Sequence, residues 1–451
     1  MGGADAALMD AAAAPGIGDI IERAPLGGVH VLVLLGCTAI AAFDGLDVLV
    51  MALAAPVLAE QWQLDARSVG LLLGSAPIGM AVGAAALAPL ADRIGRKRLL
   101  LLACALAGLG TCASSLTTAF WPLAATRLIT GLGIGAALPT LTTLTSEIAP
   151  DRWRNLFIGI VTNGYSIGTI AGALLAGGII AAWGWQGLFW CGGLGPLLLL
   201  PLLWAWLPES PYFLASRRGV GADGRLLRVL QRLSGTVAAL PTRHPALAPG
   251  TPASGLGQLL AGDLRRASLL SWLAFFCSFF VVYFIFQWIP SIVRGAGYSL
   301  DAAFRASLIA SVAGLLGPFA LAGLSARVSL QRCIVWFFVL GGLSTALIGL
   351  AGQSLPLILT ALFLSSFFTL GAEMGLFMFT ARLYPSRARA GGVGWALGVG
   401  RFGAIFGPIV GGVLIGMGWG IPAYFPLFGA VLIVAALAVR LSRFRGDSFA
   451  A

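Results

Sequence analysis

The sequence predicts an all-α membrane protein whose twelve transmembrane helices form two parallel six-helix repeats. Three observations support this prediction. Of the 451 residues, 59% are hydrophobic and only 10% are charged, whereas about 25% of the residues in an ordinary soluble domain are charged. The charges lie between uncharged runs of about 20 residues, which is the length that crosses a bilayer. The two halves of the chain also repeat each other. A soluble enzyme is therefore excluded.

Each predicted helix is an apolar run bounded by charges, glycines or prolines. The twelve runs cover residues 30–56, 66–90, 99–118, 121–146, 156–181, 187–207, 268–293, 303–325, 332–351, 355–381, 391–416 and 422–441. Residues 211–267 carry many arginines among glycines and prolines, which predicts a cytoplasmic linker between two bundles, 30–210 and 268–441. Residues 1–29 and 442–451 are predicted to be cytoplasmic tails, because the first segment lacks the pattern of a signal peptide.

Basic residues fall mainly on one side of the predicted membrane. That side carries Arg93, Arg96, Lys97, Arg98, Arg152, Arg154, Arg327, Arg332, Arg382, Arg387, Arg389, Arg440, Arg443 and Arg445. The opposite loops hold only Arg67, Arg294 and Arg305. The positive-inside rule then predicts a multi-pass protein of a bacterial-type inner membrane with both termini in the cytoplasm. The net charge of +11 is interpreted as a topology signal and not as a nucleic-acid-binding surface, because the arginines form short clusters between apolar segments.

The two halves are related by a near-constant offset. Adding 234 to the residue number carries Pro56 onto Pro290 and Arg98 onto Arg332, and adding 235 carries prolines, arginines and glycines of the fifth helix onto the eleventh. Such agreement indicates a duplication. Each half has an even number of spans, so both copies enter the membrane in the same direction, and substrate is expected between them.

The loop after the second helix, LAPLADRIGRKR from Leu87 to Arg98, combines a predicted tight turn at Gly95 with Asp92 near a helix end. It resembles the G-x-x-x-D-R-x-G-R-[KR] signature of the major facilitator superfamily, with Ala88 in place of the usual glycine. A topology-setting turn is the alternative, but it does not require Asp92, so we expect a gate here. The predicted gating residues are Asp92, Arg93, Gly95, Arg96, Glu147, Arg154 and Arg389.

Arg127 begins an R-x-x-x-G-x-G-x-G run on the fourth helix, which resembles the signature of the same superfamily at this helix. The glycines permit close helix packing, but packing does not explain the arginine. Arg127 lies roughly 9 Å inside the start of the helix. A charge at that depth is costly and indicates a functional role, here predicted to be substrate binding.

Asp44 and Asp47 are the most informative pair in the sequence. Their spacing places them on one face in the middle of the first helix. Two neighbouring carboxylates in a low dielectric do not both ionise readily, so we expect them to exchange protons. The alternative is that one of them pairs permanently with Arg127. The DGxD pattern resembles the aromatic acid:proton symporter family within the superfamily.

The resemblance continues on the eleventh helix, in YPSRARAGGVGWALGVGRFGAIFGPIVGG from Tyr384 to Gly412. Arg401 lies about 15 Å beyond Gly391, near the midplane of a hydrocarbon core about 30 Å thick. Its planar, permanently charged guanidinium suits a substrate carboxylate. An ion pair with Asp44, Asp47 or Glu373 is the alternative. Glu373, on the tenth helix, is added to the predicted proton-coupling groups, although we expect an uncharged residue there in the family.

This resemblance implies import of an aromatic carboxylate of the benzoate or hydroxybenzoate class together with protons, without enzymatic activity, metal or cofactor. Further predicted substrate contacts are Tyr283, Gln287, Trp288 and Trp395. A proton-coupled exporter of drugs or organic anions uses the same kind of carboxylates, and a transporter-like sensor also fits the sequence. The direction of flux discriminates between these alternatives.

Overall fold

The computed structural model describes residues 16–217, 220–235, 256–262, 264–352 and 354–442, and these residues form helices without strands. Within them, 11 helices are long and apolar enough to cross a membrane. One of these, α8 (Asp151–Trp206), has 56 residues and a non-helical Gly184 with φ +64° inside it. Because α8 therefore consists of two spans, the predicted total of twelve is confirmed.

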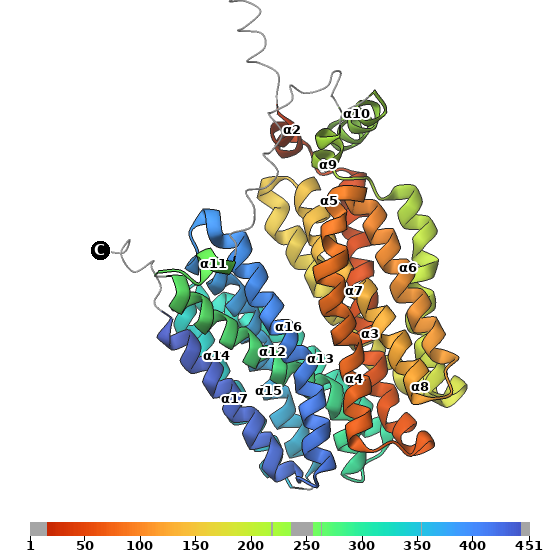
Figure 1. The fold of residues 1–451 in the computed structure, drawn as a ribbon, viewed down its shortest axis with the longest axis vertical. Coiled ribbons are helices and arrows are strands. Elements are labelled where there is room, and N and C mark those ends of the chain that lie inside the picture. Colours follow the sequence, from red (N-terminus) through yellow and green to blue (C-terminus); the bar gives the residue numbers. More distant parts are fainter. Residues whose placement is uncertain (1–15, 218–219, 236–255, 263, 353, 443–451) are drawn as a thin grey trace, which may run out of the picture.

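The spans form two bundles that follow each other along the chain. The first contains α3 (Gly28–Trp62), α4 (Ala66–Val82), α6 (Arg96–Ser115), α7 (Phe120–Ile148) and both halves of α8. The second contains α12 (Leu264–Gly295), α13 (Leu300–Ser325), α14 (Leu330–Leu350), α15 (Leu355–Leu383), α16 (Ser386–Gly416) and α17 (Ile421–Leu441). Figure 1 shows the bundles side by side, the first in orange and yellow and the second in green and blue.

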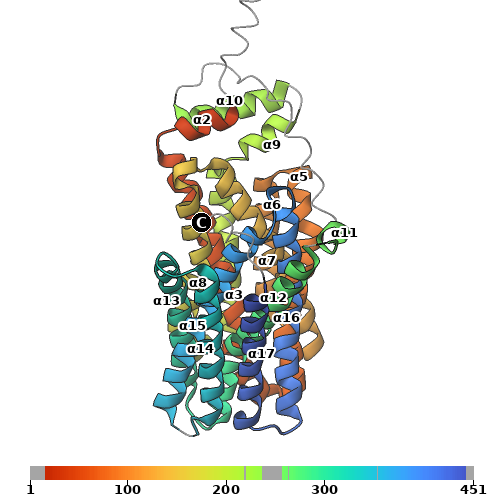
Figure 2. The same ribbon diagram turned by 90° about the vertical axis from the view of Figure 1, so that its left-hand side faces the viewer.

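Short helices gather at one end of the molecule, which we call the linker end; the opposite end is the hairpin end (Figures 1 and 2). They are α5 (Ala91–Ile94), α9 (Pro211–Ser216), α10 (Val220–Ser234) and α11 (Leu256–Leu259). The segment predicted to be an N-terminal tail also contains α2 (Ile17–Arg23). Residues 1–15 and 443–451 of the predicted tails lie outside the described residues.

Small residues let the helices of a bundle approach each other closely. A Cβ atom on Gly45 of α3 would collide with the backbone carbonyl of Tyr165 on α8, and one on Gly168 of α8 would collide with the carbonyl of Ala42. This close packing holds the middle of α3, with its two aspartates, against the first half of α8. It therefore fixes the orientation of Asp44 and Asp47.

The bundles contact each other near the hairpin end. There α4 packs on α16, and a Cβ atom on Gly70 would lie 2.9 Å from the carbonyl oxygen of Pro408. Arg294 of α12 also donates a hydrogen bond of 2.8 Å to Glu60 of α3. Toward the linker end the two bundles diverge (Figure 1).

Candidate functional site

Asp47 and Arg127 form a buried ion pair in the first bundle. The two guanidinium nitrogens of Arg127 donate to the two carboxylate oxygens of Asp47 at 3.0 and 2.7 Å. Thr111 of α6 donates a further hydrogen bond of 2.5 Å to Asp47. Arg127 is 0% exposed and its guanidinium lies 5.6 Å from the ring centroid of Phe189. Arg127, predicted to bind substrate, is therefore paired with Asp47 in this conformation, and only its buried Nε has no hydrogen-bond partner among the described residues.

Asp44 lies almost one turn away on the same helix, but its surroundings differ. It is buried, and its Oδ2 atom has no hydrogen-bond partner among the described residues. The carboxyl groups of Asp44 and Asp47 are close enough to interact electrostatically. Two acids on one face of α3 therefore have distinct environments: Asp47 is neutralised by Arg127, whereas Asp44 has no cation beside it in the part of the chain that the structure describes.

Arg401 occupies the corresponding depth in the second bundle, near the middle of the 31-residue helix α16. It forms no hydrogen bond or ion pair with any described residue. Its charge nevertheless interacts with Glu373 of α15 and with Tyr283 of α12. Ser278 of α12 donates a hydrogen bond of 3.3 Å to Glu373. The structure thus brings together three predicted site residues, Arg401, Glu373 and Tyr283. The guanidinium of Arg401 remains available to a ligand.

Tyr165 of α8 connects the acids of the first bundle with this cluster. Its hydroxyl group interacts electrostatically with Asp44 of its own bundle and with Tyr283, Glu373 and Arg401 of the other. Its side chain and those of Tyr283, Glu373 and Arg401 are all partly exposed, although their helices are otherwise well packed. The midplane of the molecule therefore has polar groups from both bundles facing one another.

The remaining predicted substrate contacts lie in other environments. Trp288 is buried and its indole N–H donates to the carbonyl of Pro408 at 2.8 Å, so it holds α12 against α16. Gln287 is also buried, at 3% exposure. Trp395 is 43% exposed, and its ring lies 6.1 Å from that of Trp272. The structure does not bring these three side chains together with Arg401 through any described hydrogen bond.

The predicted gating loop lies at the linker end. Arg96 bridges two acids, at 2.9 Å from Asp92 and 3.2 Å from Glu147. The Asp92 side chain is 77% exposed, so this aspartate contacts its own bundle and not the other. Gly95 has φ +104°, a conformation that favours glycine.

Glu209, next to this loop, holds it in place. Its carboxylate accepts a hydrogen bond of 3.1 Å from the backbone N–H of Lys97, in the first turn of α6. A Cβ atom on Gly95 would collide with the same carboxylate. An acid at a helix N-terminus is favourable because it compensates the free N–H groups there. Glu209 therefore links the end of α8 to the start of α6.

The other predicted gating residues lie at the same end. Arg154 pairs with Asp151 and donates to the carbonyl of Ser146 at 3.0 Å. The carbonyl of Arg93 accepts a hydrogen bond from Arg217, after the linker helix α9. Arg389 of α16 is exposed.

The sequence did not identify Tyr165, Ser278 and Thr111 as site residues. Serine, threonine and tyrosine occur throughout these helices, so composition alone does not distinguish the ones that face the acids. The offset of 234 carries Asp44 onto Ser278, so the repeat offered a signal for Ser278 but not for Tyr165 or Thr111. Tertiary packing places all three hydroxyl groups near the carboxylates: α8 lies against α3, Ser278 of α12 reaches Glu373 of α15, and Thr111 of α6 reaches Asp47.

Comparisons with known proteins agree with the fold. Residues 35–380 match the model of the Major Facilitator Superfamily. A gallate transporter of Pseudomonas putida is 36% identical over 422 residues, covering 93% of each chain. A 4-hydroxybenzoate transporter of Pseudomonas aeruginosa is 34% identical over 428 residues, covering 94% of each chain.

Among solved structures, the xylose transporter from E. coli in its inward open conformation superposes with a TM-score of 0.73 at 17% identity. The superposition covers 92% of this chain and 96% of the other. At this identity the likeness concerns the fold alone. The assignment to a family rests on the family match and on the two relatives, which share about a third of their residues with this chain along nearly its whole length. The chain belongs to the major facilitator superfamily, whose members are membrane transporters and not enzymes.

Proposed function

We propose that this transporter imports an aromatic carboxylate together with protons by alternating access. The observation that carries the proposal is the environment of Arg401: a cation in the middle of α16 that has no bonded partner among the described residues and faces tyrosine hydroxyls of both bundles. An unpaired charge at this depth is costly unless a ligand neutralises it. A substrate carboxylate supplies the missing negative charge.

The substrate class follows from this chemistry and from the relatives. A guanidinium offers a planar pair of donors to a carboxylate and a flat surface to a ring. The hydroxyl groups of Tyr165 and Tyr283 lie within electrostatic range of Arg401. They can donate hydrogen bonds to the ring hydroxyls of a substrate or accept hydrogen bonds from them. Gallate and 4-hydroxybenzoate, which the named relatives transport, each carry a carboxylate and ring hydroxyls. We assign a hydroxybenzoate-type acid.

Asp44 is the proposed proton carrier of the first bundle. The ion pair with Arg127 holds the carboxylate of Asp47 in place, so it serves as a structural anchor. Asp44 has an unpartnered oxygen in the same low-dielectric region, and a buried carboxyl group without a cation is most stable when protonated. Release of its proton requires water, which reaches it only when one end of the transporter opens.

Glu373 is the proposed second proton carrier. It shares the electrostatic field of Arg401 but forms no ion pair with it. When a substrate carboxylate binds Arg401, the guanidinium is neutralised and no longer favours the charged form of Glu373. Substrate binding and proton uptake by Glu373 are therefore coupled through one arginine.

The linker end is proposed to face the cytoplasm of a bacterial-type inner membrane, because it carries most basic residues. The hairpin end, where Gly70 meets Pro408, is then the closed extracytoplasmic side. In the opposite state the linker end closes. The exposed Asp92 then leaves Arg96 and pairs with the exposed Arg389 of the second bundle.

Binding measurements on Arg401 variants test this proposal. Arg401→Lys keeps the charge but loses the planar fork of donors, so we predict about tenfold weaker binding of 4-hydroxybenzoate, and Arg401→Ala about 100-fold weaker binding. The methyl ester should bind wild type and Arg401→Ala equally weakly. Calorimetry on purified protein measures these affinities. Arg382→Ala, an exposed arginine near the end of α15, is the matched control and should bind as wild type.

Retained tight binding in Arg401→Ala would show that the anchor lies elsewhere, with Arg127 the next residue to test. Flux in proteoliposomes decides between import and the exporter alternative. Accumulation of acid driven by an outside-acidic pH gradient supports import. If the same gradient drives only efflux of acid loaded inside the proteoliposomes, the transporter is an exporter.

A further inference from the structure

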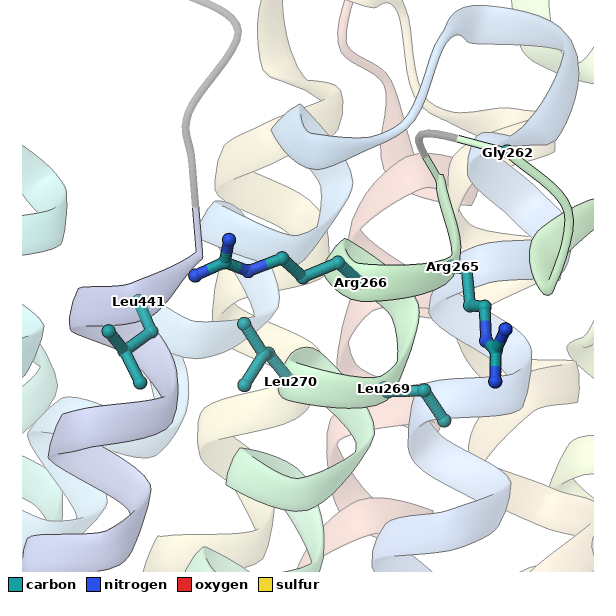
Figure 3. Close-up of a pocket in the computed structure, with 6 residues that line it drawn as sticks. All are labelled: Gly262, Arg265, Arg266, Leu269, Leu270 and Leu441. Atoms are coloured by element: carbon teal, nitrogen blue, oxygen red, sulfur yellow. The ribbon is translucent and has the colours of Figure 1, made fainter.

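A basic groove lies at the linker end of the second bundle, where α12 begins and α17 ends. It has a volume of about 490 Å³ and is lined by residues of α12 and α17 and of the turn before α12. The lining residues are Gly262, Arg265, Arg266, Leu269, Leu270 and Leu441. In Figure 3, Arg266 extends from the first turn of α12 toward the end of α17, and Arg265 extends to the other side of α12.

The two arginines have no counter-charge in the described part of the chain. Arg265 and Arg266 are both exposed and form no ion pair or hydrogen bond with a described residue. Some other arginines near helix ends have acidic partners: Arg96 pairs with Asp92, Arg154 with Asp151 and Arg294 with Glu60. Two adjacent positive charges without a partner among the described residues favour an anion from outside the chain.

The wall of the groove below the arginines is apolar. Leu269 is 46% exposed and Leu441 is 51% exposed, and Leu270 lies one turn deeper than Arg266 along α12 (Figure 3). An inorganic anion gains nothing from these leucines. A molecule with an anionic head and a hydrocarbon tail neutralises the arginines and covers the leucines at the same time.

We propose that this groove binds an anionic phospholipid, with the phosphate at Arg266, additional positive charge from Arg265 on the other side of the first turn of α12, and an acyl chain along Leu269, Leu270 and Leu441. The location supports this occupant, because α12 begins its membrane-spanning segment at Leu264 and a basic rim at this depth lies at the level of the headgroups. The groove belongs to α12, which also carries Ser278 and Tyr283. A lipid held here stabilises the position of α12 relative to α17.

Lipid titrations on the purified full-length protein, followed by native mass spectrometry, test the proposal. Each arginine near an anionic headgroup contributes about fivefold to binding, so Arg265→Gln/Arg266→Gln should bind phosphatidylglycerol about 25-fold more weakly than wild type. Phosphatidylcholine with the same acyl chains should bind both proteins equally weakly. Arg225→Gln/Arg228→Gln on α10 removes two exposed arginines from the same end of the protein and should bind phosphatidylglycerol as wild type.

Two further arms separate the lipid from its headgroup. Leu441→Glu keeps both arginines but places a carboxylate on the apolar wall, and it should also lose phosphatidylglycerol binding. Inorganic phosphate should not displace the bound lipid at equal concentration. Unchanged phosphatidylglycerol affinity in Arg265→Gln/Arg266→Gln, or displacement by phosphate alone, overturns the proposal. Equal affinity of wild type for phosphatidylcholine overturns it as well, because the arginines then contribute nothing.

Discussion

Two aspartates three residues apart on α3 have opposite surroundings. Asp47 accepts hydrogen bonds from Arg127 and Thr111, whereas an oxygen of Asp44 has no described partner. We therefore predict that Asp47→Asn lowers protein stability by about 3 kcal/mol, because it leaves the buried guanidinium of Arg127 without its counter-charge. Asp44→Asn should keep wild-type stability but lower the accumulation driven by a pH gradient, because one of the two proposed proton carriers is lost.

Thermal unfolding in detergent and proteoliposome uptake measure the two effects separately. Asp47→Asn/Arg127→Gln removes both charges of the pair and should recover part of the stability that Asp47→Asn loses. Equal destabilisation by Asp44→Asn and Asp47→Asn would contradict the division of roles. Normal pH-driven accumulation in Asp44→Asn would show that Asp44 is not a proton carrier.

The sequence predicted the aspartate pair and the alternative of a permanent pair with Arg127, because charges deep in apolar runs are conspicuous. It did not predict which aspartate forms the pair. Residues three apart on a helix share a face, and a rotation of α3 by a fraction of a turn decides which one meets α7. That rotation depends on contacts such as Gly45 against Tyr165 and Gly168 against Ala42, which are tertiary and leave no periodic signal.

At the level of elements, the sequence predicted the number and order of the spans, because each is an apolar run bounded by polar residues. The ends were less predictable. The apolar run predicted over residues 391–416 coincides with a candidate membrane span, but its helix begins earlier, at Ser386, since an arginine-rich first turn is as helical as an apolar one. The predicted break between the fifth and sixth spans is a single non-helical residue, Gly184.

The contact between α4 and α16 gives an element-scale prediction. A Cβ on Gly70 would lie 2.9 Å from the carbonyl of Pro408 and 3.1 Å from the Cα of Gly412, so a valine there forces the two helices apart. We predict that Gly70→Val shifts the population toward a state with the hairpin end open and lowers uptake several-fold. Spin labels at Leu116 and Met417, both exposed near the hairpin end, report the separation as a longer distance.

Gly323→Val is the matched control. A Cβ on Gly323 has no neighbour within 4 Å, so this variant should keep the wild-type distance and uptake. An unchanged label distance in Gly70→Val, with normal transport, would contradict the view that close packing of α4 on α16 keeps the hairpin end shut.

For the whole molecule, the duplication has produced bundles with different chemistry. The first bundle holds Asp44 beside a neutralised pair, and the second holds Glu373 beside the unpaired Arg401. Tyr165 interacts with groups of both bundles. Reorientation of one bundle against the other therefore changes the surroundings of both acids at the same time, which is what coupling of two proton sites to one substrate requires.

The charge moved in one transport cycle tests this arrangement. A substrate monoanion that enters with protons on Asp44 and Glu373 carries one net positive charge inward, so an inside-negative membrane potential should accelerate wild-type uptake. Glu373→Gln removes one proton carrier and should make uptake electroneutral, insensitive to potential but still driven by a pH gradient. Potassium diffusion potentials set with valinomycin in proteoliposomes measure this dependence.

Glu22→Gln is the control for loss of an acid, because Glu22 is exposed on α2 outside both bundles, and it should keep the potential dependence of wild type. Asp44→Asn should instead lower the accumulation that the pH gradient drives. Ser278 and Arg401 are the groups of α12 and α16 that act on Glu373, and α13 and α14 have their charged residues only near their ends. Electroneutral uptake by the wild-type protein would therefore exclude Glu373 as a carrier and leave Asp44 as the proton site.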